Sequence, residues 1–418
     1  MTQLHKKFTD KQIEQFIKRY LNKEIERKYI EKILDIKTRQ FWKLVKKYKD
    51  DPENFSIKYT RKKQPRSLDG NIEKNIMHEL AIDQNLIEDK DIPVNSYNYS
   101  YVKERLEKKY NQKVSVTTII NRAKKYNFYL KRRKKKSHDR EVSTNYIGQL
   151  IQHDASVHLF APAAQKKWYL ITSLDDHSRY MLYARFIDKE TSYSHIRGLE
   201  AVFTKYGLPY SYYVDSHSIF RFVQQRDSIW RKHHKLTDQA TPQWKHVLND
   251  CNVKVTYALS PQAKGKIERP YRWLQDHIVR TCARDNIADI KEAQRILNRE
   301  VYRYNYKRVH STTEEVPYVR FQNALESNQS LFREFEIPSP FTSTKDIFCL
   351  RTQRKADGYR KITINNIVFK VNKINPYDTL NIRIYPLNSQ VSELRFWNKH
   401  VLVDIHKIKN SDLKGVHF

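Results

Sequence analysis

The spacing of hydrophobic residues along the first 50 positions predicts three short helices. Apolar side chains recur there every three or four residues, and Thr9 and Gln12 have the spacing of a capping box before the first helix. Only the short break at 35–36 separates the second helix from the third. We therefore expect a helix-turn-helix DNA-binding domain over 1–50, although an ordinary three-helix bundle would show the same periodicity. The outward cations of its last helix that would contact DNA are Lys37, Arg39 and Lys43.

The helical period returns over 71–130. Ser115 has the position of an N-cap for a helix over 116–126, whose inward side would be apolar. We interpret this segment as a second helix-turn-helix DNA-binding domain. Its outward cations that would contact DNA include Arg122 and Lys125.

Two basic linkers flank this second helical segment. Residues 51–70 lack periodicity and contain Arg61 within a basic strip that could follow a groove of DNA, although most such linkers are simply solvated. Residues 131–145 begin with a run of six cations that includes Arg132. A run of this kind is best interpreted as a contact to phosphates.

Between 146 and 325 the pattern changes to short runs of branched and aromatic residues separated by turn residues, which is typical of strands. A helix is expected over 191–206, and 264–306 should be mainly helical. Three consecutive strands followed by alternating helices and strands favour an α/β core with a mixed sheet. The expected strands cover 150–159, 167–174, 179–187, 211–214 and 253–257.

After 338–340 the hydrophobic period returns to two. Asn365 and Asn366 would form a hairpin turn between two of about five short strands. Lys and Arg at alternate positions fit a small β-barrel over 345–410 that could bind DNA or another subunit. The expected strands are 359–364, 367–371, 379–385, 391–397 and 401–405.

The net charge of +32 indicates the class of partner. The 418 residues include 79 Lys and Arg against 47 acidic residues, a surplus that would repel itself without a polyanion. The cations recur along the whole chain and no apolar run approaches the roughly 18 residues of a membrane-spanning helix, so nucleic acid is favoured over a membrane. Charged residues throughout 1–20 and three widely spaced cysteines favour a cytoplasmic, nucleoid-associated protein.

Three carboxylates carry the candidate chemistry. Asp154 lies within an apolar strand, where burying a charge is costly unless the charge is paired or binds a metal. Asp215 ends the fourth strand, and Glu268 lies at the start of a helix. If the first and fourth strands are neighbours, both aspartates emerge at one edge of the sheet and the glutamate helix can cross there. Three such oxygen ligands suit Mg²⁺ or Mn²⁺, and two ions could activate a nucleophilic oxygen and stabilise the leaving oxygen of a phosphoryl transfer. Singly, each carboxylate is more often structural.

Polar and basic side chains surround the glutamate. Within 260–275 they could contact DNA, or could form a solvated helix face with ordinary charge pairing. By contrast, Asp175 and Asp176 are interpreted as turn residues, and His153 and His233–His234 lack the partner spacing of metal ligands. The candidate DNA contacts around Glu268 are Lys264, Lys266, Arg272 and Gln275.

The carboxylate set and the strand order around it resemble the DDE integrase and transposase superfamily, whose core has the ribonuclease H-like fold. Three further stretches support the resemblance: 168–180 is similar to the second strand and its turn, 260–269 to the glutamate helix, and 304–310 with Pro317 to the end of the core. The likeness extends to bacterial insertion-sequence transposases with an N-terminal helix-turn-helix and a C-terminal barrel. One departure is the long interval after Asp215, which would hold a basic insertion over 220–243.

The resemblance implies a multidomain protein with a catalytic core over 146–325. It implies a Mg²⁺-dependent polynucleotidyl transferase with two ions per active site, in which Asp154, Asp215 and Glu268 are catalytic residues and metal ligands. Such a transposase would bind terminal inverted repeats in double-stranded DNA, cleave the ends to 3′ hydroxyls and join them to target DNA, as a homodimer or higher oligomer. The alternatives are a non-cleaving regulator or domesticated transposase, and a nuclease without strand transfer.

Overall fold

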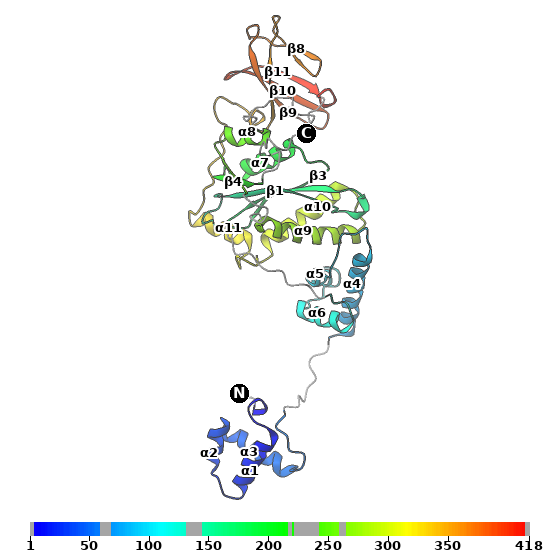
Figure 1. Cartoon of the computed structure of the whole chain (residues 1–418), viewed down its shortest axis with the longest axis vertical. Coiled ribbons are helices and arrows are strands. Elements are labelled where there is room, and N and C mark those ends of the chain that lie inside the picture. Colours follow the sequence, from blue (N-terminus) through cyan, green and yellow to red (C-terminus); the bar gives the residue numbers. More distant parts are fainter. Residues whose placement is uncertain are drawn as a thin grey trace, which may run out of the picture. The chain divides into compact units, whose positions relative to one another are not determined.

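The computed structural model describes residues 4–58, 68–130, 144–215, 220, 242–258 and 265–413, apart from the side chains of 265–268. The chain divides into two compact units, Met1–Lys74 and Asn75–Phe418, which are described separately. Figure 1 colours both units along the sequence.

The first unit is a small helical bundle. Its helices are η1 (Leu4–Lys6), α1 (Asp10–Leu21), α2 (Arg27–Leu34) and α3 (Thr38–Asp50). The predicted capping box is confirmed, because Thr9 and Gln12 each accept the backbone N–H of the other, at 2.9 and 3.3 Å. Asp35 ends α2 in the left-handed conformation and turns the chain sharply into α3. The apolar faces of the three longer helices meet in one core built on Ile13, Ile17, Ile30, Leu34, Phe41 and Val45.

A second helical segment begins at the boundary between the two units and lies mostly in the larger one. It consists of α4 (Gly70–Glu88), α5 (Tyr99–Tyr110) and α6 (Val116–Lys125). The expected N-cap of α6 is confirmed, since the backbone N–H of Thr118 donates to Ser115 Oγ at 3.1 Å. Asn111, in the left-handed conformation, ends α5 four residues before that cap.

A five-stranded mixed sheet forms the centre of the larger unit, as predicted. The strand order is β3-β2-β1-β4-β5; β1, β2 and β3 pair antiparallel, whereas β1, β4 and β5 pair parallel. Each observed strand lies within two residues of its predicted range. The strands are β1 (Ile151–His158), β2 (Trp168–Asp175), β3 (Met181–Ile187), β4 (Ser211–Val214) and β5 (Lys254–Tyr257).

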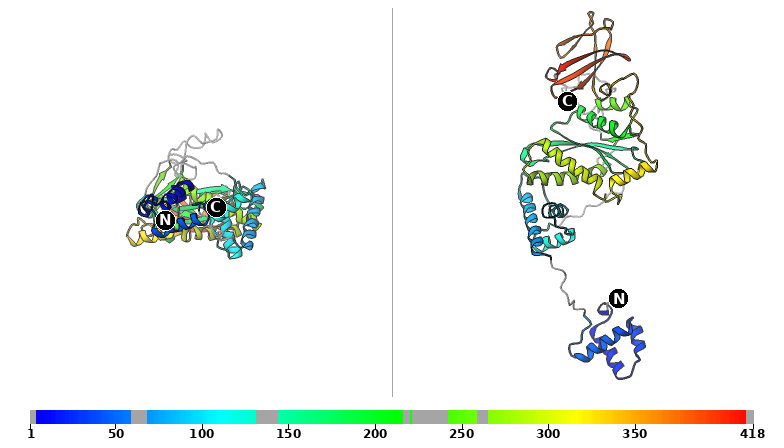
Figure 2. Two further views of the ribbon diagram at one scale, coloured as in Figure 1. Left: turned by 90° about the horizontal axis from the view of Figure 1, so that it is seen from below. Right: turned by 180° about the vertical axis from the view of Figure 1, so that it is seen from behind.

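Helices cover both faces of this sheet, as Figure 1 shows and the view from behind in Figure 2 confirms. Helices α7 (Ser192–Tyr206) and α8 (Gln243–Asp250) pack on one face. Helices α9 (Gly265–Arg284) and α10 (Ile290–Tyr306) pack on the other, against Leu170 and Leu174 of β2. The sheet is therefore covered on both faces, apart from its edge strand β5, where Lys254 and Thr256 are exposed.

The C-terminal strands form an open sheet. After α11 (Pro317–Glu326) and α12 (Thr344–Ile347), the described strands pair as a four-stranded antiparallel sheet, β11-β10-β9-β6, and a separate β7-β8 hairpin. A closed barrel is not confirmed. The predicted hairpin turn is confirmed, since Asn365 and Asn366 both have positive φ between β7 and β8. The strands are β6 (Leu350–Lys355), β7 (Lys361–Ile364), β8 (Ile367–Lys370), β9 (Thr379–Pro386), β10 (Val391–Asn398) and β11 (Val401–Lys409), before η6 (Asn410–Asp412).

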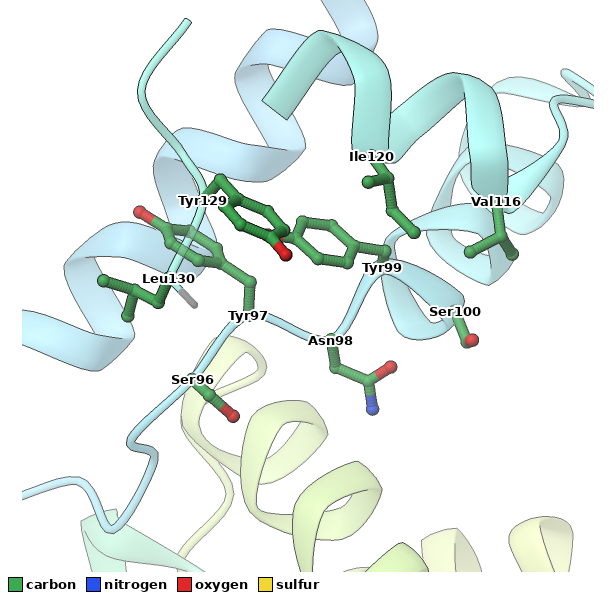
Figure 3. Close-up of a pocket in the computed structure, with 9 residues that line it drawn as sticks. All are labelled: Ser96, Tyr97, Asn98, Tyr99, Ser100, Val116, Ile120, Tyr129 and Leu130. Carbon is green, nitrogen blue, oxygen red and sulfur yellow. The ribbon is translucent and has the colours of Figure 1, made fainter. Parts of the chain in front are cut away.

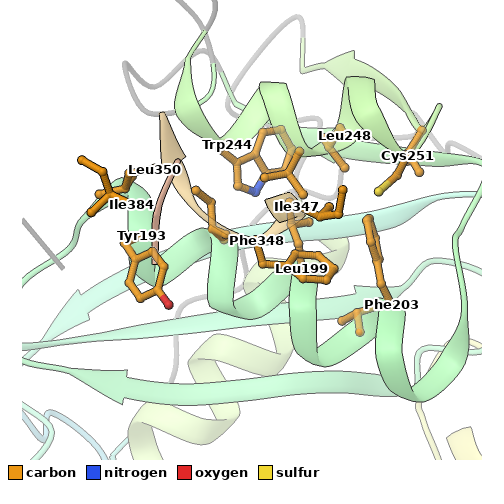
Figure 4. Close-up of a cluster of buried hydrophobic side chains, with 14 of the residues drawn as sticks. Tyr193, Leu199, Phe203, Trp244, Leu248, Cys251, Ile347, Phe348, Leu350 and Ile384 are labelled. Carbon is orange, nitrogen blue, oxygen red and sulfur yellow. The ribbon is translucent and has the colours of Figure 1, made fainter. Parts of the chain in front are cut away.

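A shared hydrophobic core joins this C-terminal sheet to α7 and α8. Figure 4 shows Ile347 and Phe348 lying among side chains of both helices. The rings of Phe203 on α7 and Phe348 pack with their centroids 6.0 Å apart. All of these side chains are buried, so the C-terminal sheet is packed against the same core as the central sheet.

Candidate active site

The register of β1 and β4 places Asp154 and Asp215 at the same level. These strands pair in parallel with Ile151 opposite Tyr212 and Gln152 opposite Tyr213, an offset of 61 positions. The same offset separates Asp154 from Asp215, which directly follows the last residue of β4. Neighbouring strands lie about 4.8 Å apart, and residues at one level of a parallel pair face the same side of the sheet. The structure therefore brings these two predicted site residues together.

Helix α9 crosses β1 on the face that carries Asp154. The Tyr271 hydroxyl donates a hydrogen bond to the backbone carbonyl oxygen of Asp154 at 2.7 Å and accepts one from Thr172 Oγ1 at 2.8 Å. Thr172 lies opposite Asp154 on β2. One turn further along α9, Gln275 Nε2 donates to Ser156 Oγ at 2.8 Å. These bonds fix the helix across the strand at Asp154 and two residues beyond it.

The charges of the aspartates reach Tyr271. Burial raises the pKa of Tyr271 well above its ordinary value, and the negative charges of Asp154, Glu190 and Asp215 act in the same direction. A phenol in this environment remains protonated near neutral pH, so its hydroxyl can keep donating to the strand. Tyr271 was not identified from the sequence, although its position three residues after Glu268 places both on one face of a helix.

The backbone of Glu268 lies in the first turn of α9, on the helix face that Tyr271 and Gln275 turn toward β1. Its side chain is outside the described set. Among the side chains that are described, no group of three His, Cys, Asp or Glu is arranged to hold a metal ion. With Glu268 as the third member, the donor set would consist of carboxylate oxygens, which are the ligands that Mg²⁺ and Mn²⁺ prefer.

A buried chain of polar side chains supports β1 from the opposite face. His153 is hydrogen-bonded through Nδ1 to Ser173 Oγ and through Nε2 to His195 Nδ1, both at 2.9 Å. The other ring nitrogen of His195 lies 2.8 Å from the Glu190 carboxylate. The partners of His153 are distant in sequence, so periodicity alone did not reveal this chain. His153 is thus a packing residue beside Asp154.

The turn after β2 is held by Asp175 and Asp176, as the structural interpretation of these residues predicted. Asp175 accepts hydrogen bonds from the backbone N–H groups of Gly148 and Ser178, both at 2.8 Å. Asp176 accepts from Gln152 Nε2 at 2.5 Å and from Arg179 Nη1 at 3.0 Å. Both carboxylates are fully buried and engaged in the turn.

The predicted DNA contacts are distributed over both units. Lys37, Arg39 and Lys43 are exposed at the start and along α3 of the first unit, and Arg272 is exposed on α9. On α6, Lys125 is exposed with its Nζ 3.0 Å from the Tyr126 hydroxyl, whereas Arg122 is half-buried. Gln275 uses its amide for Ser156. Four predicted contacts lie outside the described residues or side chains: Arg61, Arg132, Lys264 and Lys266. Most of the insertion 220–243 also lies outside them.

Within the described ranges, none of the helices combines the length and apolar character that a membrane crossing requires.

Comparison of the sequence finds transposases. No family model matches the chain. It is 28% identical over 178 residues to y4bF, a predicted transposase of Sinorhizobium fredii, covering 42% of this chain and 37% of that protein. It is 27% identical over 172 residues to the transposase for insertion sequence IS1202 of Streptococcus pneumoniae, covering 41% of this chain and 35% of that protein. The chain thus spans about a third of the length of these curated relatives. The resemblance to insertion-sequence transposases is confirmed.

Comparison of the structure finds retroviral integrases at low similarity. The HTLV-2 integrase catalytic core domain in complex with magnesium, in its trimeric form, matches 44% of this chain and 99% of that chain with 15% identity and a TM-score of 0.29. The simian T-cell lymphotropic virus intasome in complex with PP2A regulatory subunit B56 gamma matches 69% and 90% with 13% identity and a TM-score of 0.32. Because these TM-scores are low, the description of the fold rests on the strand order and register of this chain and not on these matches.

Proposed function

We propose that this chain is a DDE-type transposase that cleaves the ends of an insertion sequence to 3′ hydroxyls and joins them to target DNA. The observation that carries the proposal is the parallel register of β1 and β4, whose offset of 61 positions equals the separation of Asp154 and Asp215. Helix α9, which includes Glu268, crosses the same face of the sheet. Similarity to two transposases and the net charge of +32 support DNA as the substrate.

Asp154, Asp215 and Glu268 would hold two Mg²⁺ ions, with Mn²⁺ as a substitute. When bound, such ions supply the positive charge that activates the attacking oxygen and stabilises the leaving oxygen of an in-line phosphoryl transfer. The protein's own contribution is to hold the carboxylates in position. Tyr271 fixes the backbone of Asp154 from α9, and the sheet register fixes Asp215 beside it. No covalent intermediate with the protein is needed, because water attacks during cleavage and the freed 3′ hydroxyl attacks during joining.

The remaining parts of the chain would bind DNA. We assign the helices within 1–50 and 71–130 to helix-turn-helix domains that recognise the terminal inverted repeats, joined by the basic linkers 51–70 and 131–145. The core over 146–325, with its insertion 220–243, would bind the strands being cut. The C-terminal strands within 345–410, for which the sequence pattern predicted a small barrel, would bind DNA or another subunit. Two ends need paired active sites, so a homodimer or larger assembly on DNA is expected.

A cleavage assay on labelled duplexes tests this function. The inverted repeats that flank the gene supply the substrate, which is incubated with the full chain and Mg²⁺. The native protein should nick the ends and join them to a second DNA, and Asp215→Asn should reduce both steps by about 10³-fold, because several kcal/mol of transition-state stabilisation are lost. Asp188→Asn is the matched control, since this exposed aspartate at the end of β3 pairs with Lys166 at 2.8 Å outside the carboxylate set.

The products separate the alternatives. Binding of the ends without any cleavage would indicate a regulator or domesticated transposase, and cleavage without joining would indicate a nuclease. Full activity of Asp215→Asn would refute the site assignment.

A further inference from the structure

A pocket of about 370 Å³ lies between the start of α5 and the start of α6. Figure 3 shows Tyr97, Tyr99 and Tyr129 gathered at one side of this pocket, with Val116 and Ile120 of α6 beside them. Its volume falls within the roughly 300–1,000 Å³ of sites that bind small ligands. We name it the tyrosine pocket.

The three tyrosine rings form a nearly parallel stack. Tyr97 and Tyr99 have centroids 6.0 Å apart and planes inclined by 13°, and Tyr99 and Tyr129 have centroids 6.5 Å apart and planes inclined by 10°. The hydroxyl of Tyr99 donates to the carbonyl oxygen of Phe128 at 2.9 Å, which fixes the middle ring. Parallel, fixed rings present flat faces onto which another flat ring can stack.

Buried ionic contacts from α9 hold the backbone of the pocket in place. Arg280 donates to the carbonyl oxygen of Ser96 and, at 2.8 Å, to Asp83 of α4. The side-chain amide of Asn98 donates to Asp276. Because the arginine is fully buried and its charge is matched by carboxylates, the segment that carries Tyr97 and Tyr99 is fastened to α9.

The outer end of the stack is accessible and positively charged. Tyr129 is 42% exposed, and Lys124 Nζ lies 5.1 Å from the centre of its ring. No carboxylate is among the described residues that line the pocket. A ligand with an aromatic ring and an attached anion would therefore find a stacking face and a cation side by side.

Helix α9 includes the proposed third catalytic carboxylate and also anchors the backbone of the pocket. Asp276, which anchors the pocket, follows Glu268 by eight residues, which is about 12 Å along a helix. A DNA strand bound at the carboxylates is thus within reach of the pocket a few nucleotides away, since each nucleotide of a duplex strand advances about 3.4 Å along the helix axis.

We propose that the tyrosine pocket binds an unpaired nucleobase of the DNA end, stacked on Tyr129, with its phosphate beside Lys124. This inference rests on the proposed function, because it assigns a place to one strand of the same DNA. A nucleobase fits the observations because every base has a flat aromatic face, so stacking requires no particular sequence, and because each base is attached to an anionic phosphate. Capture of an unpaired base would keep the two strands of the DNA end separated while the phosphodiester to be cut lies at the carboxylates.

Fluorescence of 2-aminopurine tests the pocket directly. The probe is a short single-stranded oligonucleotide with a central 2-aminopurine, titrated with the full chain without divalent metal, and the same sequence as a duplex serves for comparison. Binding should quench the probe as the base stacks on tyrosine. Tyr129→Ala should remove the quenching and weaken single-strand binding by about tenfold, whereas duplex binding should change by less than about twofold. Tyr129→Phe keeps the ring and should behave as the native chain.

The matched control is Tyr359→Ala. Tyr359 is 79% exposed and has Lys361 Nζ 5.8 Å from its ring centre, but it lies in the C-terminal part of the chain and away from the pocket. Its substitution should leave the quenching intact. Equal loss in Tyr359→Ala and Tyr129→Ala, or undiminished quenching in Tyr129→Ala, would overturn the proposal. Failure of the proposed function has a different signature: the native chain would then quench the probe through Tyr129 but would not cleave DNA ends with Mg²⁺.

Discussion

The hydroxyl of Tyr271 connects α9 to the residue Asp154 itself, and Tyr271→Phe removes that connection without changing the shape of the ring. The hydroxyl bridges the Asp154 carbonyl oxygen and Thr172 Oγ1 within a buried region of the sheet face. A hydrogen bond contributes about 0.5–1.5 kcal/mol, and a buried partner left without one costs about 1–3 kcal/mol. Since two partners lose their bonds, we expect the free energy of unfolding to fall by about 2–3 kcal/mol.

Urea denaturation of the full chain, followed by tryptophan fluorescence, measures this loss. Tyr304→Phe is the control, because Tyr304 is also buried but its hydroxyl has no hydrogen-bond partner among the described residues. Its substitution should leave the free energy of unfolding unchanged or raise it, because it removes a buried hydroxyl that has no partner in the described part of the chain. A second measurement is the rate of DNA end cleavage with Mg²⁺, which should fall by about tenfold or more in Tyr271→Phe, because small displacements of reacting groups are costly. If the two variants behave alike in both measurements, Tyr271 does not position Asp154.

Three further predictions concern the ionic contacts of α4 with α9 and the C-terminal hairpin. Arg280→Met should destabilise the chain by about 2–3 kcal/mol in urea denaturation, because it removes one of the two arginine partners of the buried Asp83 and leaves the carbonyl oxygen of Ser96 without its donor. Arg284, at 2.7 Å, still pairs with Asp83 in this variant. The pKa of Glu79 lies below its ordinary 4.5. Burial alone would raise this pKa, but the hydrogen bond from Arg284, 2.5 Å away, and the charges of the surrounding cations together lower it by more. Glu79 therefore stabilises the fold above about pH 4.5, and the stability difference between the native chain and Glu79→Gln should disappear as the pH falls through the lowered pKa. Asn366→Gly should raise stability by up to about 1 kcal/mol, because Asn366 has a φ of 69° in the hairpin turn.

Each of these predictions has a distinct control. Lys166→Met breaks an exposed ion pair with Asp188 and should cost less than about 1 kcal/mol, in contrast to Arg280→Met. An unchanged difference between the native chain and Glu79→Gln at acidic pH would contradict the role assigned to Arg284. Gly substituted at the exposed position Asn121, in the middle of α6, should destabilise, as expected for a glycine inside a helix, so stabilisation there would refute the backbone argument for Asn366.

Local patterns in the sequence predicted the central sheet closely, because each strand has its own run of branched or aromatic residues. The strand expected over 150–159 is observed as Ile151–His158. By contrast, β6 was missed, since Arg-Thr-Gln-Arg-Lys follows Leu350 without an apolar alternation, and an edge strand needs few buried side chains. The two aspartates suggested that the first and fourth strands are neighbours. Whether Asp154 and Asp215 lie opposite each other depends on the register of these strands, which tertiary packing decides.

Charged side chains were the least predictable part. Arg280 has the sequence context of a solvated helix cation, yet it is fully buried, and its partner Asp83 is 197 positions away. A helix period identifies which positions share a face, but not whether another helix covers that face. The same limit applies to Gln275, whose predicted contact with DNA competes with its bond to Ser156.

Helix α9 connects three features that the sequence presents separately. It includes Glu268 in its first turn, contacts β1 through Tyr271, and anchors α4 and the tyrosine pocket through Arg280. Its 20 residues extend for about 30 Å, and a continuous helix transmits a displacement along its length because its turns are hydrogen-bonded in series. Pro270 is the exception, since it has no N–H to donate to the carbonyl oxygen of residue 266. The bond from Tyr271 to the Asp154 carbonyl oxygen comes immediately after this proline. It is therefore the contact that fixes the first helical turn of α9, which includes Glu268, relative to Asp154.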